Sequence, residues 1–334
     1  MQFKHFIGFD VSKATLDCAL VENGKTIFHQ QIKNQLKAIK TFLELLQKDY
    51  DCHLNQTLFT MEFTGIYTYH LRTVLAEMKA NIWLVAPLHI SRKGGLQRGK
   101  NDKIDAIRIA QFAYRNKDEY RPYIPLRPVL QQLKHLFSFR RQLVKCKKQI
   151  NTHTQDLTFM QSSVAKQIEL LVQKPVNQID VQIKVVEQSM MNLIQSDKVL
   201  SRLYLIINSV VGFGLVLSVK TLLITNEFKT IKDPRKFACM AGVAPFEYSS
   251  GSSIRKQTRV SAMADPELKK LLHLAALIAI RVSEELKKYY DRKKQEGKHS
   301  MKVINAIRNK LIHRVFACVN QDRIYIKHEY ERAD

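Results

Sequence analysis

Residues 100–106 read Lys-Asn-Asp-Lys-Ile-Asp-Ala, and the chain is organised around this stretch because two carboxylates three residues apart open an amphipathic helix. At this spacing the side chains of Asp102 and Asp105 leave the same helical face, about one turn apart. One interpretation is capping, with Asp102 as the N-cap and Asp105 completing a capping box. The other is a divalent metal, held by carboxylates together with water and phosphate oxygens. This stretch alone favours capping, since short motifs often match by chance.

The sequence before this helix predicts a strand-rich domain. Asn23-Gly24 suits a tight hairpin turn, and Pro87 stops the last apolar strand. The predicted order is three strands, helix, strand, helix, strand, and then the helix that carries Asp102 and Asp105. This order is typical of a ribonuclease-H-like α/β domain. The predicted strands are residues 5–11, 15–22, 25–32, 56–62 and 80–86, and the predicted helices are residues 34–48 and 66–78.

Two further acids lie at strand ends of this predicted sheet. Asp10 falls at the end of the first strand and Glu62 closes the fourth, and sites in open α/β sheets form at the carboxyl ends of strands. If these strands are neighbours, a helix packed across that edge brings Asp102 and Asp105 beside them. Four carboxylates repel one another unless cations bind between them. The combined pattern favours a metal site, with Asp10 as an ordinary strand-end residue and Glu62 as a solvated acid as the alternatives.

Composition points to a polyanionic partner. The 334 residues include 54 Lys and Arg against 30 Asp and Glu, and 45% are hydrophobic, enough to bury the cores of two domains. The formal net charge of +24 favours nucleic acid first and an anionic membrane surface second. No apolar run has the length of a membrane span, no signal region opens the sequence, and the five scattered cysteines fit neither a zinc site nor a disulfide framework. We therefore expect a cytoplasmic protein without a membrane partner.

The middle of the chain predicts long helices. From Pro128 to Asp197 the sequence has an apolar stripe and a basic face that includes Arg140 and Arg141, and Pro175 predicts an interruption. Coiled-coil pairing is typical of such helices, and contact between the basic face and nucleic acid is an open alternative. We expect an α/β domain, a helical coiled-coil spacer and a mainly α C-terminal domain. These three parts are residues 1–122, 123–200 and 201–334.

One segment of the C-terminal part carries groups that could do chemistry. Residues 241–253 read Ala-Gly-Val-Ala-Pro-Phe-Glu-Tyr-Ser-Ser-Gly-Ser-Ser, and three cations follow them, Arg255, Lys256 and Arg259. Composition alone predicts a flexible Ser/Gly loop with a basic border. Such a loop can also present a serine hydroxyl to a DNA phosphate, with guanidinium groups balancing the charge on the phosphoryl oxygens.

Three other C-terminal segments are less informative. Residues 211–214, Val-Gly-Phe-Gly, separate two apolar helical stretches, as in a helix-hairpin-helix that approaches a DNA phosphate, although a simple turn is favoured. Residues 287–298 predict a charged, exposed segment, and residues 301–318 an amphipathic helix. We favour a solvated face for the basic positions of that helix, with contact to a nucleic-acid backbone as the alternative. These positions are Arg308, Lys310, His313 and Arg314.

The acidic motifs resemble those of the DEDD insertion-sequence transposases, the Piv and MooV-like recombinases. The matching motifs are Gly-Phe-Asp-Val-Ser-Lys at 8–13, Glu-Phe-Thr-Gly-Ile-Tyr at 62–67 and Asn-Asp-Lys-Ile-Asp-Ala at 101–106. The resemblance implies an N-terminal domain similar to the RuvC Holliday-junction resolvase. It also implies a magnesium site, in which manganese can substitute. Its ligands would be Asp10, Glu62, Asp102 and Asp105.

The C-terminal half is similar to the transposase domain of the same family, in which a Gly-x-x-Pro stretch leads to a Ser-Gly pair. The nucleophilic serine of that family maps onto Ser250, with Ser249 as the adjacent candidate. The resemblance implies a covalent phosphoserine–DNA intermediate. The sequence departs from the family at Val211-Gly212, where Pro-Gly is usual, and at residues 262–265, where Ala-Met-Ala-Asp replaces Lys-x-Gly-Asn.

The function implied by this resemblance is an insertion-sequence recombinase that acts on donor and target DNA as a homodimer or homotetramer. A structured noncoding RNA, the bridge RNA, would guide it by base pairing. Two alternatives stay open: a metal-dependent, structure-specific nuclease of the Holliday-junction type, and a non-catalytic nucleic-acid-binding protein with structural acids. The residues expected to contact nucleic acid are Lys13, Arg92, Lys93, Arg98, Lys100, Arg140, Arg141, Arg255, Lys256 and Arg259.

Overall fold

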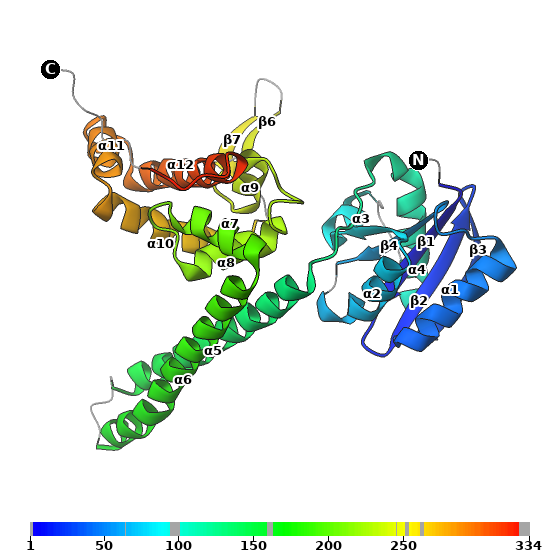
Figure 1. Cartoon of the computed structure of the whole chain (residues 1–334), viewed down its shortest axis with the longest axis horizontal. Helices are drawn as coiled ribbons and strands as arrows, with labels where there is room; N and C mark the ends of the chain where they lie inside the picture. The colour runs from blue at the N-terminus through cyan, green and yellow to red at the C-terminus, as the bar shows by residue number, and fades with distance from the viewer. Residues whose placement is uncertain are drawn as a thin grey trace. The chain divides into compact units, whose positions relative to one another are not determined.

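The computed structural model forms two compact units, Met1–Pro125 and Leu126–Asp334, each with its own hydrophobic core (Figure 1). The division of the sequence into three parts stays a prediction. Among the described residues, no helix is long and apolar enough to cross a membrane. The structure describes residues 3–63, 65–93, 101–158, 163–244, 246–250, 254–260 and 264–326, without the side chains of residues 92, 153–158, 246–250 and 254–259.

The first unit contains a five-stranded mixed sheet in the order β3-β2-β1-β4-β5. The strands β1, β2 and β3 pair antiparallel, whereas β4 runs parallel to both β1 and β5. Asn23 and Gly24 form the β2–β3 turn with positive φ at both residues, as a type I′ turn requires. The strands are β1 (His5–Val11), β2 (Thr15–Glu22), β3 (Lys25–Lys33), β4 (Thr57–Glu62) and β5 (Asn81–Val85), each within a residue of its predicted bounds.

Helices cover both faces of this sheet. The buried residues of α1 and α2 pack with Ile7 and Phe9 on one face, and those of α4 pack with Phe6 and Leu58 on the other. Successive strand residues point to opposite faces, which explains the alternation. The short helix α3 begins at Pro87, where the sequence predicted a loop, because proline suits the first turn of a helix. The helical segments are α1 (Leu36–Tyr50), η1 (Gly65–Thr68), α2 (Tyr69–Glu77), α3 (Pro87–Lys93), α4 (Asp102–Arg115) and η2 (Lys117–Glu119).

Gly8 allows α4 to lie directly on β1. A Cβ atom at this position would lie 2.3 Å from both the carbonyl oxygen of Ala106 and the amide nitrogen of Ala110, far inside van der Waals contact. The backbone of α4 therefore touches the strand, and any larger residue would push the helix away. This contact places the first turn of α4 at the carboxyl end of β1.

The second unit is mainly helical. Two long helices, α5 and α6, pack along each other, and α6 continues through Pro175, so the predicted interruption there is wrong. Residues 284–295 form α11, where the sequence predicted only an exposed segment. The elements are α5 (Pro128–Thr158), α6 (Ser163–Ser196), α7 (Lys198–Asn208), α8 (Leu215–Thr225), α9 (Pro234–Met240), β6 (Phe246–Ser250), β7 (Ile254–Arg259), α10 (Pro266–Val282), α11 (Glu284–Gln295) and α12 (Ser300–Asn320).

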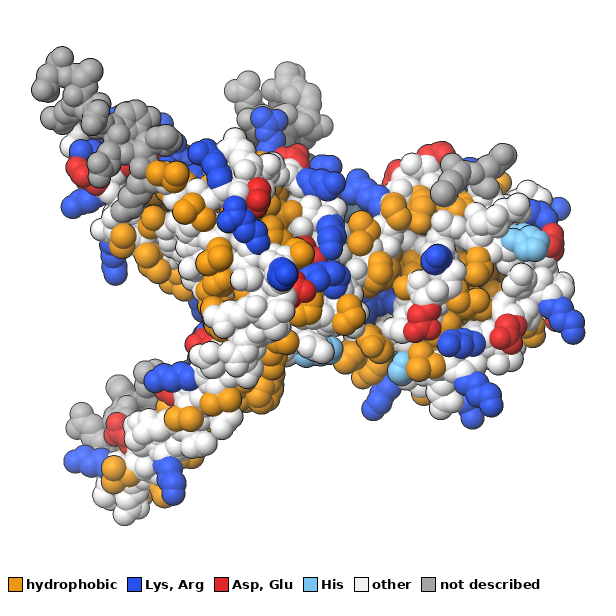
Figure 2. Space-filling model, viewed as in Figure 1, with side chains coloured by type: hydrophobic (Ala, Val, Ile, Leu, Met, Phe, Trp, Pro, Cys, Tyr) orange, Lys and Arg blue, Asp and Glu red, His pale blue; other side chains and the backbone are white. Residues whose placement is uncertain are grey.

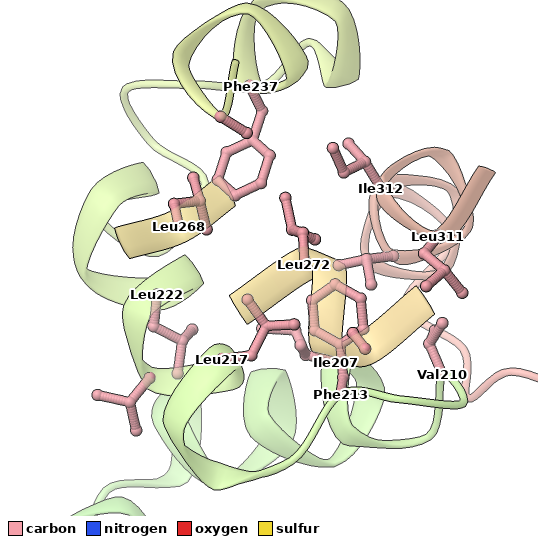
Figure 3. Packing of buried hydrophobic residues seen from close by; sticks show 14 of the residues in the cluster. Ile207, Val210, Phe213, Leu217, Leu222, Phe237, Leu268, Leu272, Leu311 and Ile312 are labelled. Atoms are coloured by element: carbon pink, nitrogen blue, oxygen red, sulfur yellow. The ribbon is translucent and has the colours of Figure 1, made fainter. Parts of the chain in front are cut away.

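The core of this unit lies between α7, α8, α10 and α12, where Phe213 packs with Leu217, Leu272 and Leu311 (Figure 3). Gly212 has a φ of +92°, and a Cβ atom there would lie 2.4 Å from the carbonyl oxygen of Ala275. The α7–α8 turn is therefore fixed by close packing on α10. This packing favours the simple turn over a helix-hairpin-helix that binds phosphate.

Arg127 fastens the base of the two long helices to the rest of the unit. Its guanidinium donates to Asp197 Oδ2 and Oδ1 at 2.8 and 2.9 Å, and also to the carboxylate of Glu227. Lys229 pairs with the same Glu227 carboxylate. Asp197 in turn caps α7 by accepting from the Leu200 amide at 2.9 Å. Every charge in this Arg127 cluster therefore meets an opposite charge.

Candidate active site

Asp10 and Glu62 lie side by side at the carboxyl edge of the sheet. Phe9 pairs with Met61 in the parallel β1–β4 register, so the two acids are the next residues along neighbouring strands, which run about 4.8 Å apart. Asp10 and Glu62 lie two and four residues after Gly8 and Leu58, so both share the sheet face on which α4 packs. Both side chains are half-buried. The fold thus brings together the two strand-end acids that the sequence singled out.

The first turn of α4 brings Asp102 and Asp105 toward the same edge. The N-cap is Asn101, whose side chain accepts from the Lys103 amide at 2.9 Å, so the alternative in which Asp102 is the N-cap is wrong. With Asn101 at the N-cap, Asp105 does not stand at the capping-box position either. Instead, Asp105 accepts from Arg108 at 2.8 Å. Capping therefore does not account for either acid.

The electrostatics of Asp10 link these elements into one site. Burial raises the pKa of its carboxyl, and the negative charges of Asp102, Asp105 and Asp17 raise it further, while a hydrogen bond from the Val11 backbone lowers it. The proton is thus held more tightly because the charged form is poorly compensated. We use the name acidic edge for Asp10, Glu62, Asp102 and Asp105 together. Its donors are carboxylate oxygens, the ligands that hard divalent cations prefer.

The acidic edge is not a closed ligand cage. Within the described part of the chain, no group of three or more His, Cys, Asp or Glu residues is arranged to hold a metal ion. Magnesium is usually held by one or two carboxylates, with water and substrate phosphates completing its coordination. The chemistry of the donors therefore fits magnesium, and the arrangement fits an ion that substrate helps to hold.

Asp17 is an acid that sequence reasoning missed. It lies opposite Asp10 in the antiparallel β1–β2 register and is only 5% exposed. Its two oxygens are hydrogen-bonded to His29 Nε2 at 2.8 Å and to Gln31 Nε2 at 2.9 Å, both from β3. Both carboxylate oxygens of Asp17 are therefore already hydrogen-bonded within the sheet. The signal for it was an acid inside the otherwise apolar run Leu-Asp-Cys-Ala-Leu-Val of β2.

The cations expected to bind nucleic acid in the first unit have different surroundings. Lys13 is exposed in the β1–β2 turn, three residues after Asp10. Lys93, at the end of α3, donates to Glu119 at 2.5 Å and to Asn116 at 2.8 Å. Arg92 lies in α3, but its side chain is outside the described part, and Arg98 and Lys100 lie wholly outside it.

The second unit presents its predicted cations on α5 and on a hairpin. Arg140 is paired with Glu187 of α6 at 2.7 Å, whereas Arg141 is largely exposed and lies 3.8 Å from Glu267. Figure 2 shows Lys and Arg side chains spread over the visible face, with Asp and Glu between them. Arg255, Lys256 and Arg259 lie in β7, and only their backbone is described.

Ser250 is the last residue of β6, in an antiparallel hairpin with β7 where composition predicted a flexible loop. In its register Ser250 pairs with Ile254 and Ser249 with Arg255. The segment entering β6 is fixed by Asn305 of α12, whose Nδ2 donates to the Val243 carbonyl at 2.7 Å. The backbone therefore holds both serines on an ordered strand, while their side chains lie outside the described part.

Two transposase families match this chain. Residues 7–160 match the DEDD transposases of the IS110 type, and residues 204–291 match the transposase family described as IS116/IS110/IS902. The chain is 26% identical to the pilin gene-inverting proteins of Moraxella lacunata and Moraxella bovis, over 98% of this chain and 99% of each relative. RuvC of Thermus thermophilus shares 11% identity at a TM-score of 0.28, covering 36% of this chain and 99% of RuvC. The first matched range contains the acidic edge, and the second contains Ser250.

Proposed function

We propose that this chain, whose residues 7–160 and 204–291 match transposase families of the IS110 type, is a DNA recombinase that cuts and rejoins the donor and target DNA of an insertion sequence. The observation that carries the proposal is the acidic edge. Carboxylates from two strand ends and one helix converge there, and Asp10 has a pKa raised by burial and by its acidic neighbours. An acid with a perturbed pKa, gathered with other acids at one edge of a sheet, is typical of a functional site.

The acidic edge would hold a divalent cation, which we propose to be magnesium. The ion would stabilise negative charge on the phosphoryl oxygens of the scissile phosphate. Asp10 and Glu62, fixed on neighbouring strands, would hold it from the sheet side. Asp102 is exposed on the first turn of α4 and would complete the set with Asp105, which exchanges its bond to Arg108 for the ion.

Ser250 would be the nucleophile. Its hydroxyl oxygen would form a bond to phosphorus while the bond from phosphorus to a sugar oxygen breaks, leaving the strand joined to the protein and a free hydroxyl on the other end. The serine proton is lost in this step, and the departing sugar oxygen gains one. Support comes from the position of Ser250 within the second matched range, beside Arg255 and Lys256 of β7.

We further propose that the protein acts as a homodimer or homotetramer on a structured guide RNA. Exposed apolar side chains on α6, Val164, Leu170 and Leu171, support a pairing surface, since single helices seldom leave such residues in water. The net charge of +24 can accommodate DNA and RNA together. Base pairing with the RNA would then choose the DNA sequence, and the protein would bind backbone and shape.

One experiment separates this function from its alternatives. The protein is incubated with junction DNA of its element, guide RNA and magnesium, and covalent protein–DNA adducts are resolved on denaturing gels. We expect an adduct with the wild type, none with Ser250→Ala, and a normal one with the control Ser253→Ala. Asp102→Asn should form none either, because the metal ligand is lost.

The other outcomes identify the rival readings. An adduct that survives in Ser250→Ala and disappears in Ser249→Ala would move the nucleophile by one residue. Magnesium-dependent cleavage without any adduct would replace the recombinase mechanism with hydrolysis by a structure-specific nuclease. Binding that is never followed by cleavage would indicate a non-catalytic nucleic-acid-binding protein.

A further inference from the structure

Arg308 is a buried arginine in the second unit. It lies on α12, is 4% exposed, and the solvated face expected from the sequence is wrong for this residue. Its Nη1 donates to Asn305 at 3.3 Å and its Nη2 to His273 Nδ1 at 2.5 Å, while its Nε has no hydrogen-bond partner. The guanidinium is thus enclosed but incompletely bonded.

The charge balance around Arg308 differs from that around a paired arginine. Among the side chains that the structure describes, no carboxylate forms an ion pair with it, and burial lowers the pKa of its guanidinium. Arg127, by contrast, forms ion pairs with the carboxylates of Asp197 and Glu227. An unpaired buried charge is strongly unfavourable, and oppositely charged groups are its usual partners. The site therefore has the charge and the donors to bind an anion.

His273 of α10 adds a second hydrogen-bond donor to this site. Arginine can only donate hydrogen bonds, so His273 Nδ1 must be the acceptor, and the proton of the neutral ring lies on Nε2. Burial lowers the pKa of His273, and the Arg308 charge lowers it further, so the ring stays neutral near pH 7. The half-buried imidazole therefore offers one fixed N–H donor beside the buried guanidinium.

Hydrogen bonds connect Arg308 and His273 to the segment that precedes β6, the strand that carries Ser250. Asn305 accepts from Arg308 and, through its Nδ2, donates to the Val243 carbonyl just before β6. The start of α10 is joined to the same segment, because the Asp265 amide donates to the Met240 carbonyl at 2.7 Å. Hydrogen bonds thus connect both helices to the residues that lead into the serine hairpin.

We propose that Arg308 and His273 form a phosphate-binding site for the DNA strand on which the β6–β7 hairpin acts. This inference rests on the proposed function and assigns two residues to holding its substrate. A phosphate oxygen would accept from His273 Nε2, and its negative charge would compensate Arg308. Hydrogen bonds between charged partners are short and strong, which suits the positioning of one strand for attack.

The test measures binding of a single-stranded DNA end of the element to full-length protein by fluorescence anisotropy at fixed salt. Arg308→Met removes the charge at similar volume, His273→Leu removes the imidazole donor, and Lys310→Met removes an exposed cation of the same helix as the control. We expect Arg308→Met to weaken binding by roughly ten- to a hundredfold, the usual value of a hydrogen bond to a charged group. His273→Leu should weaken it several-fold, and Lys310→Met by less than either.

Two further measurements identify the ligand. An uncharged methylphosphonate is placed at each position of the strand in turn. One position should weaken the wild type and leave Arg308→Met unaffected, as expected if that phosphate meets Arg308. The thermal midpoint without DNA should be unchanged or higher in Arg308→Met, and inorganic phosphate should raise it only in the wild type.

Several results would overturn the proposal. The proposal is overturned if Arg308→Met binds the DNA as tightly as Lys310→Met does, or if every methylphosphonate position affects the wild type and Arg308→Met alike. If Arg308→Met unfolds, His273→Leu decides alone, and normal DNA binding by that variant means that Arg308 is structural. A loss confined to an RNA strand of the same sequence would assign the pair to the guide. If the wild type binds no DNA, the proposed function fails, and the inorganic phosphate measurement still decides the site.

Discussion

The acidic edge and the Arg127 cluster place carboxylates in opposite electrostatic surroundings. At the Arg127 cluster, the hydrogen bonds from Arg127 and the Leu200 amide lower the pKa of Asp197 to about 2. At the acidic edge, burial and the neighbouring acids raise the pKa of Asp10. The charged form of Asp197 is stabilised by its partners, whereas the charged form of Asp10 is destabilised, which is typical of a group that binds a ligand. The same contrast separates Arg127 from Arg308 among the cations.

Removing Arg127 tests the paired side of this comparison and should have the largest effect on stability. In Arg127→Met, Glu227, whose side chain is 1% exposed, and Asp197 lose their shared partner. We expect the free energy of unfolding of the second unit to fall by about 3–5 kcal/mol, as for other broken buried pairs. Urea unfolding followed by far-ultraviolet circular dichroism measures it, because most helices lie in that unit.

The matched control for this measurement is Arg202→Met. Arg202 pairs with Asp322, but both side chains are about half exposed or more. Exposed pairs contribute roughly 0–1 kcal/mol, so this variant should unfold almost like the wild type. Equal losses in the two variants would show that the pairing around Arg127 is not what stabilises the unit.

Acid should remove the contribution of Asp197. Its pKa is lowered from 3.8 to about 2 in the folded state, so its stabilisation is complete above about pH 4 and is lost as the pH falls toward 2. Asp197→Asn keeps an N-cap side chain but loses the charge, and should be less stable by about 2 kcal/mol at pH 7. That difference, measured by the same urea unfolding, should vanish near pH 2. A constant difference across this range would contradict the assigned pairing.

Neutralising Asp10 should raise the stability of the first unit, and this is the smallest of the expected changes. Asp10→Asn removes the unfavourable charge of the acidic edge and should stabilise the metal-free first unit by about 0.5–1 kcal/mol while abolishing recombination. Trp83 is the single tryptophan of the chain and is buried in this unit, so its fluorescence follows the unfolding. The control is Asp17→Asn, which breaks the bonds to His29 and Gln31 and should destabilise the same unit. Destabilisation by both substitutions would show that Asp10 is also paired internally.

The fold of the first unit could be predicted because its signals are local. Alternating apolar residues, the Asn23-Gly24 turn and the strand-end acids are all visible within short windows of sequence. The capping alternative for Asp102 was wrong by one residue, because Asn101 and Asp102 are both good caps and only the backbone geometry decides between them. Asp17 was missed because its partners belong to a neighbouring strand.

The C-terminal site could not be predicted because its contacts are distant in sequence. Arg308 meets His273 across 35 residues, and Asn305 meets Val243 across 62. On a helical wheel Arg308 lies four residues after Ile304 and four before Ile312, on the buried face of α12, whereas Lys310 lies on the exposed face. Periodicity therefore carried a signal for its burial, but its partner His273 could be found only from the packing of α12 on α10. The hairpin β6–β7 is similar, since its Ser- and Gly-rich composition gives no strand signal.

The Arg127 cluster also has a mechanical consequence. Arg127 immediately precedes α5, and Asp197 lies between α6 and α7, so the cluster joins both ends of the α5–α6 pair at one point. The base of the α5–α6 pair is therefore rigidly anchored and does not act as a hinge. A force on the far end, such as the pull of a second subunit, would therefore act as a torque on α7 and on the turn after α8 that holds Glu227.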